Sequence, residues 1–134
     1  MSIVAVRSAL QAKLDGMSPA LATAWENVGY TPVTGTPYQA AFVMPATPEN
    51  PTMGDDFYRE QGIFQISLFY PLDVGTGVAE ARAELIKTTF KRGTSMISGT
   101  VTVRIDRTPD ISAGRVDGDR WHIPVKIRWF AGII

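Results

Sequence analysis

The stretch Arg59–Pro71, REQGIFQISLFYP, is the longest run of strand character in the chain and organises the rest of it. Successive side chains of a strand point to opposite faces, so residues two apart share a face. One face of this stretch is apolar: Phe64, Ile66, Leu68 and Tyr70. The other face is mixed, because Ile63 and Phe69 interrupt its polar positions. The pattern predicts a central strand with one face on the main core and the other partly covered.

Downstream of this strand, the sequence predicts a turn and then its strongest helix. Apolar side chains recur at helical spacing at Ala79, Ala83, Ile86 and Phe90, which predicts a helix over 78–92 closed by Gly93. The preceding turn, 73–77, carries two glycines, as phosphate-binding loops do, but neither G-x-G-x-x-G nor a P-loop pattern is present. Glu80 in the first turn would repel phosphate, so helix capping by Thr76 is the favoured interpretation.

The remaining segments complete an α+β pattern. A helix is predicted over 2–15, a short strand over 22–25, a strand over 38–44, a polar connector over 94–99, and two half-exposed strands over 101–106 and 121–129. The last two are expected to pair antiparallel and to place Arg104, Arg107, Lys126 and Arg128 on one basic surface. Pro124 indicates an edge or bulge near the final strand. We expect a single domain over residues 1–134, with a mixed or mostly antiparallel β-sheet and two α-helices packed on it.

Two loops are the candidate contact regions. Residues 45–58 show no periodic pattern, and a loop of this length is usually functional or disordered. It is either an arm that reaches a neighbouring molecule or a mobile surface loop. The second loop, 111–120, contains Asp117-Gly118, a dipeptide typical of type I′ turns, so a small protruding hairpin is expected. The candidate interface residues are Met53, Asp55, Asp56, Phe57, Tyr58, Arg115, Asp117, Asp119 and Arg120.

The net charge of the chain is zero, but acidic and basic side chains are distributed unevenly along the sequence. The 134 residues carry 13 basic and 13 acidic side chains. Residues 1–81 hold three basic and eight acidic side chains, and residues 82–134 hold ten basic and five acidic ones. Opposite charge in the two halves would steer copies head to tail, unless the halves interleave in the fold and the asymmetry disappears.

The residues that carry chemistry are few. The chain has no cysteine, which excludes disulfides and thiolate catalysis, and no apolar run approaches a membrane span. Its single histidine, His122, lies on the polar side of a strand and is expected at the surface. Asp117-Gly118-Asp119 resembles the start of a calcium loop but lacks the later ligands, so turn chemistry explains it better. Metal binding by Asp55-Asp56 is an alternative interpretation, and a solvated charged loop is the favoured one. We expect no enzyme, no cofactor and no metal.

Several spaced residues resemble the small tail terminator-like proteins of long-tailed phages. They are Trp25-Glu26-Asn27, Pro37-Tyr38, the strand Gly62–Ile66 ending in Tyr70-Pro71, the helix closing on Phe90, and the final Pro124–Trp129. The resemblance covers nearly the whole chain. The family that it indicates is similar in role to the phage lambda tail terminator. It implies a structural subunit that forms a ring, typically a hexamer, at the head-proximal end of the tail tube. Such a ring stops tube polymerisation and presents the head-joining surface.

The same resemblance implies the partners and the location. They are other copies of the chain, the tail tube protein and a head completion or connector protein, in a virion tail assembled in the bacterial cytoplasm. No membrane is involved, and DNA is only cargo passing through the lumen. Two alternatives stay open: another head–tail connector or minor tail component, and a monomeric domain that binds a small molecule or nucleic acid through the basic strand face.

Overall fold

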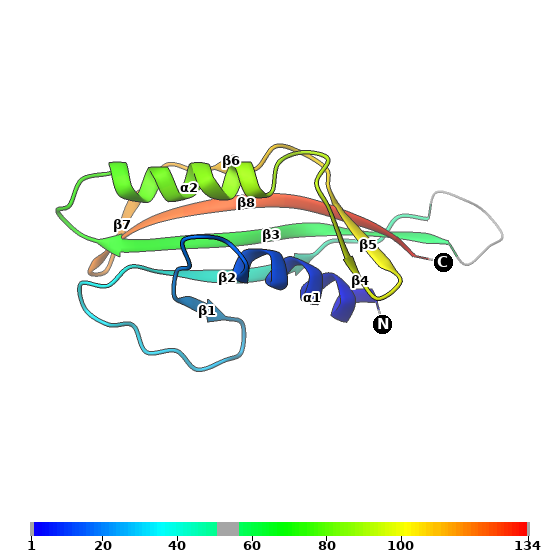
Figure 1. Cartoon of the computed structure of the whole chain (residues 1–134), viewed down its shortest axis with the longest axis horizontal. Coiled ribbons are helices and arrows are strands. Elements are labelled where there is room, and N and C mark those ends of the chain that lie inside the picture. Colours follow the sequence, from blue (N-terminus) through cyan, green and yellow to red (C-terminus); the bar gives the residue numbers. More distant parts are fainter. Residues whose placement is uncertain (1, 51–56, 134) are drawn as a thin grey trace.

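Two fourteen-residue strands run side by side along the long axis of the molecule and form the centre of its sheet (Figure 1). They are β3 (Tyr58–Pro71) and β8 (Arg120–Ile133), paired antiparallel over their whole length. The computed structural model describes residues 2–50 and 57–133. The predicted central strand 59–71 is confirmed, and its apolar face of Phe64, Ile66 and Leu68 is fully buried.

The described residues form one sheet of eight strands in the order β1-β2-β3-β8-β5-β4, with β6 and β7 also paired to β8. All neighbouring strands are antiparallel except β1 and β2, so the expected mixed, mostly antiparallel α+β domain is confirmed. The other strands are β1 (Thr23–Trp25), β2 (Tyr38–Pro45), β4 (Ser95–Ser98), β5 (Val101–Ile105), β6 (Asp110–Ile111) and β7 (Arg115–Asp117).

Strands β4 and β6 were not predicted, and β7 was expected only as one arm of a small hairpin at Asp117-Gly118. The polar connector expected over 94–99 is wrong, because Ser95–Ser98 pairs with β5 as a hairpin around Gly99 and Thr100. Its polar serines hide the pattern, and only Met96 of this strand is buried. Strands β6 and β7 are two and three residues long, below the length at which alternation can be recognised.

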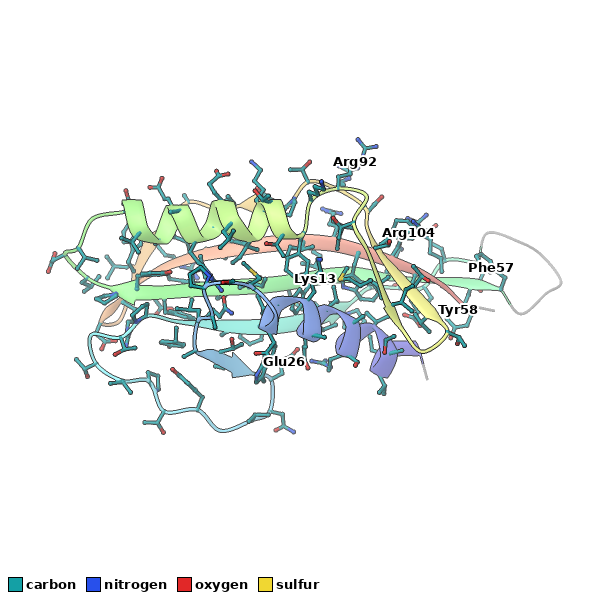
Figure 2. The ribbon with its side chains drawn as sticks, in the orientation of Figure 1. Lys13, Glu26, Phe57, Tyr58, Arg92 and Arg104 are labelled. Carbon is teal, nitrogen blue, oxygen red and sulfur yellow. The ribbon has the colours of Figure 1, made fainter. Side chains whose placement is uncertain are left out.

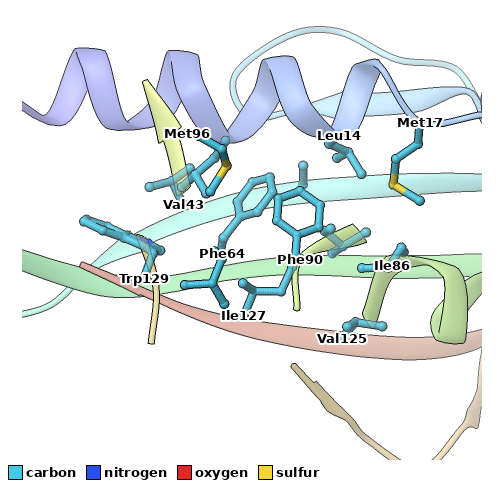
Figure 3. Close-up of a cluster of buried hydrophobic side chains, with 14 of the residues drawn as sticks. Leu14, Met17, Val43, Phe64, Ile86, Phe90, Met96, Val125, Ile127 and Trp129 are labelled. Atoms are coloured by element: carbon cyan, nitrogen blue, oxygen red, sulfur yellow. The ribbon is translucent and has the colours of Figure 1, made fainter. Parts of the chain in front are cut away.

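Both helices cover one face of the sheet (Figure 1). Helix α1 (Ser2–Asp15) buries Val6, Leu10 and Leu14, while α2 (Gly77–Thr89) buries Ala83 and Ile86. Figure 3 shows the core between them, where the rings of Phe64 and Phe90 lie 5.9 Å apart in a tilted arrangement. The predicted packing of two helices on the sheet is therefore confirmed.

The ends of α2 differ from the expectation. The helix ends at Thr89 with Phe90 as its C-terminal cap, rather than running to 92, and Gly93 adopts a positive φ in the turn beyond it. Thr76 precedes the first helical residue, but its side chain makes no capping hydrogen bond. Its backbone carbonyl accepts a bond from Glu80 N instead. The position of the helix start was thus right, and its side-chain cap was wrong.

Pro124 marks a gap in the pairing along β8, as the sequence indicated. One edge of β8 pairs continuously with β3, while the other pairs in turn with β7, β6 and β5. The β7 register ends at His122, and the β6 register begins at Val125. Proline has no N–H to donate, so the second ladder is interrupted where Pro124 lies. Its carbonyl still accepts a hydrogen bond from Ser112 N, at 3.0 Å.

The free edge of β2 is closed by a side chain. Strand β1 ends at Trp25, and the next residue, Glu26, accepts a hydrogen bond from Val43 N at 2.6 Å. The same carboxylate oxygen accepts one from Arg7 of α1 at 2.8 Å. Burial by itself would raise the pKa of Glu26, but the bonds from Arg7 and Val43 outweigh it and lower the pKa. The ionised carboxylate of Glu26 therefore links α1, β1 and β2.

Candidate assembly surfaces

The sheet face turned away from the helices is the main candidate surface. Because the strands are in register, its side chains form rows across β2, β3 and β8. From one end to the other, the rows are Tyr38–Phe69–His122, Ala40–Ser67–Pro124, Phe42–Gln65–Lys126 and Met44–Ile63–Arg128. Tyr38, Ala40, Phe42 and Met44 therefore share one face of β2, and that face is the outer one.

One half of this outer face is covered by the chain itself. Tyr38 stacks on Phe69 with ring centroids 4.9 Å apart, and Phe69 stacks on His122 at 4.6 Å. Tyr30, from the loop before β2, adds a fourth ring 5.2 Å from Tyr38. Ser67 in the next row is only 2% exposed. We call these residues, Tyr30, Tyr38, Phe69 and His122, the aromatic row.

Arg120 holds the loop that covers this half. Its guanidinium donates hydrogen bonds to the carbonyls of Thr36 and Val33, the latter at 2.6 Å, and lies 5.1 Å from the ring centre of Tyr38. These carbonyls are 84 and 87 residues away in the chain. Arg120 was predicted as an interface residue; it is buried, at 4% exposed, and its described contacts are within its own subunit.

His122 is buried rather than at the surface, so that expectation is wrong. It faces outward from β8 but is covered by the aromatic row and by β7, whose Arg115 lies opposite it. Burial is the main cause that lowers its pKa, and the charge of Arg115 adds to the effect. Asp117, with a carboxylate oxygen 3.8 Å from Nδ1, opposes them. Among the described residues, neither ring nitrogen has a hydrogen-bond partner.

The other half of the outer face is open. Phe42 and Met44 are 38% and 40% exposed, and Lys126 and Arg128 are exposed beside them. Two shallow concavities of about 190 and 270 Å³ lie here and share Ile63 and Arg128. We call this region, which comprises Phe42, Met44, Ile63, Arg107, Lys126 and Arg128, the open half.

The expected basic surface is present in part. Arg107, Lys126 and Arg128 line the same concavity of about 270 Å³, together with Asp110. Arg107 also lines a neighbouring concavity of about 370 Å³ with Arg92 and Asp106. Arg104 lies on β5 opposite Phe130, one row beyond Arg128 (Figure 2). Charges of both signs therefore border the open half, with a basic excess.

The first predicted contact loop begins and ends as an extension of the β2–β3 hairpin. Glu49 and Arg59 exchange two backbone hydrogen bonds, of 2.9 and 2.8 Å. Met53, Asp55 and Asp56 lie outside the described residues. Phe57 and Tyr58 are half-buried at the start of β3 (Figure 2), and the Phe57 ring packs against the backbone of Gly132.

The second predicted contact loop is not a free protrusion. Its residues form β6 and β7 along the edge of β8, and a tight turn at Gly118 and Asp119 joins β7 to β8. Only Gly118 of these two residues has a positive φ, which fits a type II′ turn instead of the expected type I′. The side chains of Arg115, Asp117 and Asp119 are exposed.

The described residues hold no cluster of three or more His, Asp or Glu side chains suited to a metal ion. None of the helices in the described part of the chain is long and apolar enough to cross a membrane. The segment Asp117-Gly118-Asp119, which resembles the start of a calcium loop, forms the turn between β7 and β8, as the sequence favoured. An exposed sheet face that mixes Phe42, Met44 and basic side chains is typical of a protein that contacts other proteins.

Comparison with known proteins agrees with this class. The family model described as phage tail terminator protein matches residues 5–129, so the chain belongs to the phage tail terminator family. This is a family of structural proteins, and membership implies a non-enzymatic role in a phage tail.

One solved structure, of a protein designated only by a sequence number, is similar along the whole molecule. Its TM-score is 0.80 at 26% identity, covering 100% of this chain and 98% of that chain. No curated protein matches the chain. The resemblance drawn from the spaced aromatics, glycines and prolines is thereby confirmed at the level of the family.

Proposed function

We propose that the protein forms a closed ring, of six copies as in the family resemblance, at the head-proximal end of the tail tube. The ring stops tube polymerisation and provides the surface on which the head is joined. Membership of the tail terminator family over residues 5–129 is the observation that carries this proposal. Its partners are other copies of itself, the tail tube protein and a head completion protein, and DNA passes through the lumen as cargo.

The subunit has the surfaces that such a role needs. A ring requires each subunit to offer two different patches, one for each neighbour. The exposed side chains Arg115, Asp117 and Asp119 lie at one end of β8, and the open half lies toward the other. We propose that these residues, with loop 45–58, contact neighbouring subunits or the tube. Arg120 contributes from inside, by holding the loop beside them.

Tail length is the test of termination. Phage particles or lysates lacking this protein are examined by negative-stain electron microscopy, with expression of the intact protein from a plasmid as the control. We expect overlong tails without attached heads, restored to uniform length by the plasmid. Tails of normal length joined to heads in the absence of the protein would refute the proposal.

Loop 45–58 has its own experiment. Residues 51–56 are replaced by a short glycine-serine turn, while the Glu49–Arg59 pairing is kept. We expect unchanged thermal unfolding and lost complementation of tail length. Complementation equal to that of the intact protein would show that the loop is not a contact.

A further inference from the structure

The open half is incompletely buried and incompletely neutralised. A surface that mixes exposed aromatic, Met and basic side chains is typical of protein contacts, whose centres are enriched in aromatic residues, Met and Arg. Of the residues that the structure describes, none lies within ion-pair distance of Arg107, Lys126 or Arg128. Asp110 lies opposite Lys126 in the β6–β8 register and offsets part of this charge, while the remaining positive charge has no ion pair among the described residues.

The matching negative charge lies at the opposite end of the sheet. Pro71 at the end of β3 pairs with Arg120 at the start of β8, so the turns on either side meet there. These turns carry Asp73, Asp117 and Asp119, all exposed, which we call the acidic tip. No Lys or Arg among the described residues pairs with them. Arg115 is exposed on the same hairpin, so the tip keeps an excess of acidic side chains at its surface.

These two regions are too far apart to neutralise each other. Ile63 and Pro71 are eight residue steps apart on β3, which is about 26 Å at the rise of a strand. The Debye length at physiological ionic strength is only about 8 Å. Attraction between the acidic tip and the open half is therefore screened within one subunit, and a second copy can bring the opposite charges into contact.

We propose that the acidic tip of one copy docks on the open half of the next. Asp73, Asp117 and Asp119 face the basic side chains there, while Phe42, Met44 and Ile63 lose water on contact. The two patches differ, so the contact is heterologous, and each subunit of a docked pair keeps its other patch free for a further neighbour. This assignment rests on the proposed ring, because a ring is the closed form of such a series.

A charge-exchange experiment tests the pairing. The open-half variant is Lys126→Glu with Arg128→Glu, and the tip variant is Asp117→Lys with Asp119→Lys. Each alone should weaken self-association about a hundredfold, because like charges then meet at the contact. Mixing the two variants, or combining all four substitutions in one chain, restores complementary charge at every contact and should restore association.

Association is measured by sedimentation velocity across protein concentrations and salt, with circular dichroism to check folding. The matched control for each variant is a double charge reversal of the same sign outside both patches: Lys87→Glu with Lys91→Glu for the open-half variant, and Asp15→Lys with Glu84→Lys for the tip variant. Each control should associate as the unmodified protein does. Wild-type association in either charge-reversed variant, or no rescue in the mixture and in the four-substitution chain, would overturn the pairing.

A cysteine cross-link gives a second test of the contact. It also works on assembled tails, so it applies even if the free protein is monomeric. The chain has no cysteine, so Lys126→Cys with Asp119→Cys introduces one thiol in each patch. Under mild oxidation we expect a ladder of multimers from purified tails, and at most dimers from each single substitution. Lys91→Cys with Asp119→Cys is the control expected to give no ladder. Absence of the ladder from the first pair would contradict the proposed docking.

The inference and the proposed function fail separately. If the ladder is absent while loss of the protein still gives overlong tails, the protein terminates tails through a different contact. If the ladder forms and the charge exchange rescues association, but loss of the protein leaves tails normal, the docking stands and tail termination is wrong.

Discussion

The two halves of the outer sheet face have the same backbone pairing but differ in exposure, because one half is covered and the other is open. At one end, the row Tyr38–Phe69–His122 is stacked and covered; at the other, the row Met44–Ile63–Arg128 is left open. The pairing of β2, β3 and β8 is continuous through both. What differs is a loop and one arginine that holds it. Closure of a sheet face is thus decided by a loop outside the sheet and by the arginine at the start of β8 that holds it.

The largest effect is expected at the arginine that closes the covered half. Arg120→Ala removes two hydrogen bonds from a charged donor and the contact with Tyr38, so the protein should lose about 3 kcal/mol of unfolding free energy. Urea denaturation followed by circular dichroism measures the loss. Arg120→Lys keeps the charge but not the fork of donors and should lose less. An unchanged Arg120→Ala protein would mean that the loop is held by something else.

A smaller effect is expected from the rings themselves. Phe69→Ala leaves a gap between Tyr38 and His122 and should cost about 2 kcal/mol, because it removes both stacking contacts and buried area. Phe42→Ala, which removes an exposed phenylalanine from the open half of the same face, should cost less than about 1 kcal/mol. The same urea titration compares the two variants. Equal losses would remove the distinction between covered and open halves.

The third effect depends on pH. The pKa of His122 is lowered from its usual 6.5 in the folded state, chiefly by burial, so the unfolded chain takes up a proton first as pH falls. Stability should therefore decline as pH falls from about 6.5 toward the folded pKa and be unaffected above pH 7.5.

Thermal unfolding at a series of pH values measures that decline. The His122→Phe variant keeps a ring against Phe69 and cannot titrate, so its melting temperature should depend less on pH over the same range. Identical pH profiles for the two proteins would show that His122 protonation does not affect folding.

The smallest effect on stability is expected in the open half. Lys126→Ala with Arg128→Ala removes two exposed charges that have no ion pair among the described residues, so unfolding free energy should change by no more than about 0.5 kcal/mol. The same variant should show weaker self-association by sedimentation. A large loss of stability would place these side chains in the fold rather than at a contact.

Most of the fold could be predicted because it depends on local patterns. The alternation in β3 and β8 and the helical spacing of Ala79, Ala83 and Ile86 each repeat over enough residues to be recognised. Pro124 was informative for a different reason, since a missing N–H has the same effect in any sheet. Strand β4 was missed because its exposed serines contribute no apolar period.

The surfaces were harder to predict than the elements. Alternation showed that His122 faces away from the core side of β8, but it cannot show whether a distant loop covers that face. The covering depends on Arg120 and carbonyls 84 and 87 residues away, a separation at which no sequence pattern operates. Of the predicted contact residues, Arg115, Asp117 and Asp119 are exposed, while Met53, Asp55 and Asp56 lie outside the described residues. Their role in contacts stays a prediction.

The carboxylate of Glu26 has a consequence for how copies can meet. Along the outer edge of β2, alternate N–H groups are directed at β1 up to Ala41; the next, on Val43, is bound by Glu26, and Pro45 has none. A strand from another molecule finds no free donor there to pair with. Exposed strand edges are the usual starting points of aggregation, and charge and proline are two of the devices that block them. This edge is thereby protected against uncontrolled sheet growth, and encounters between copies are directed to side-chain surfaces.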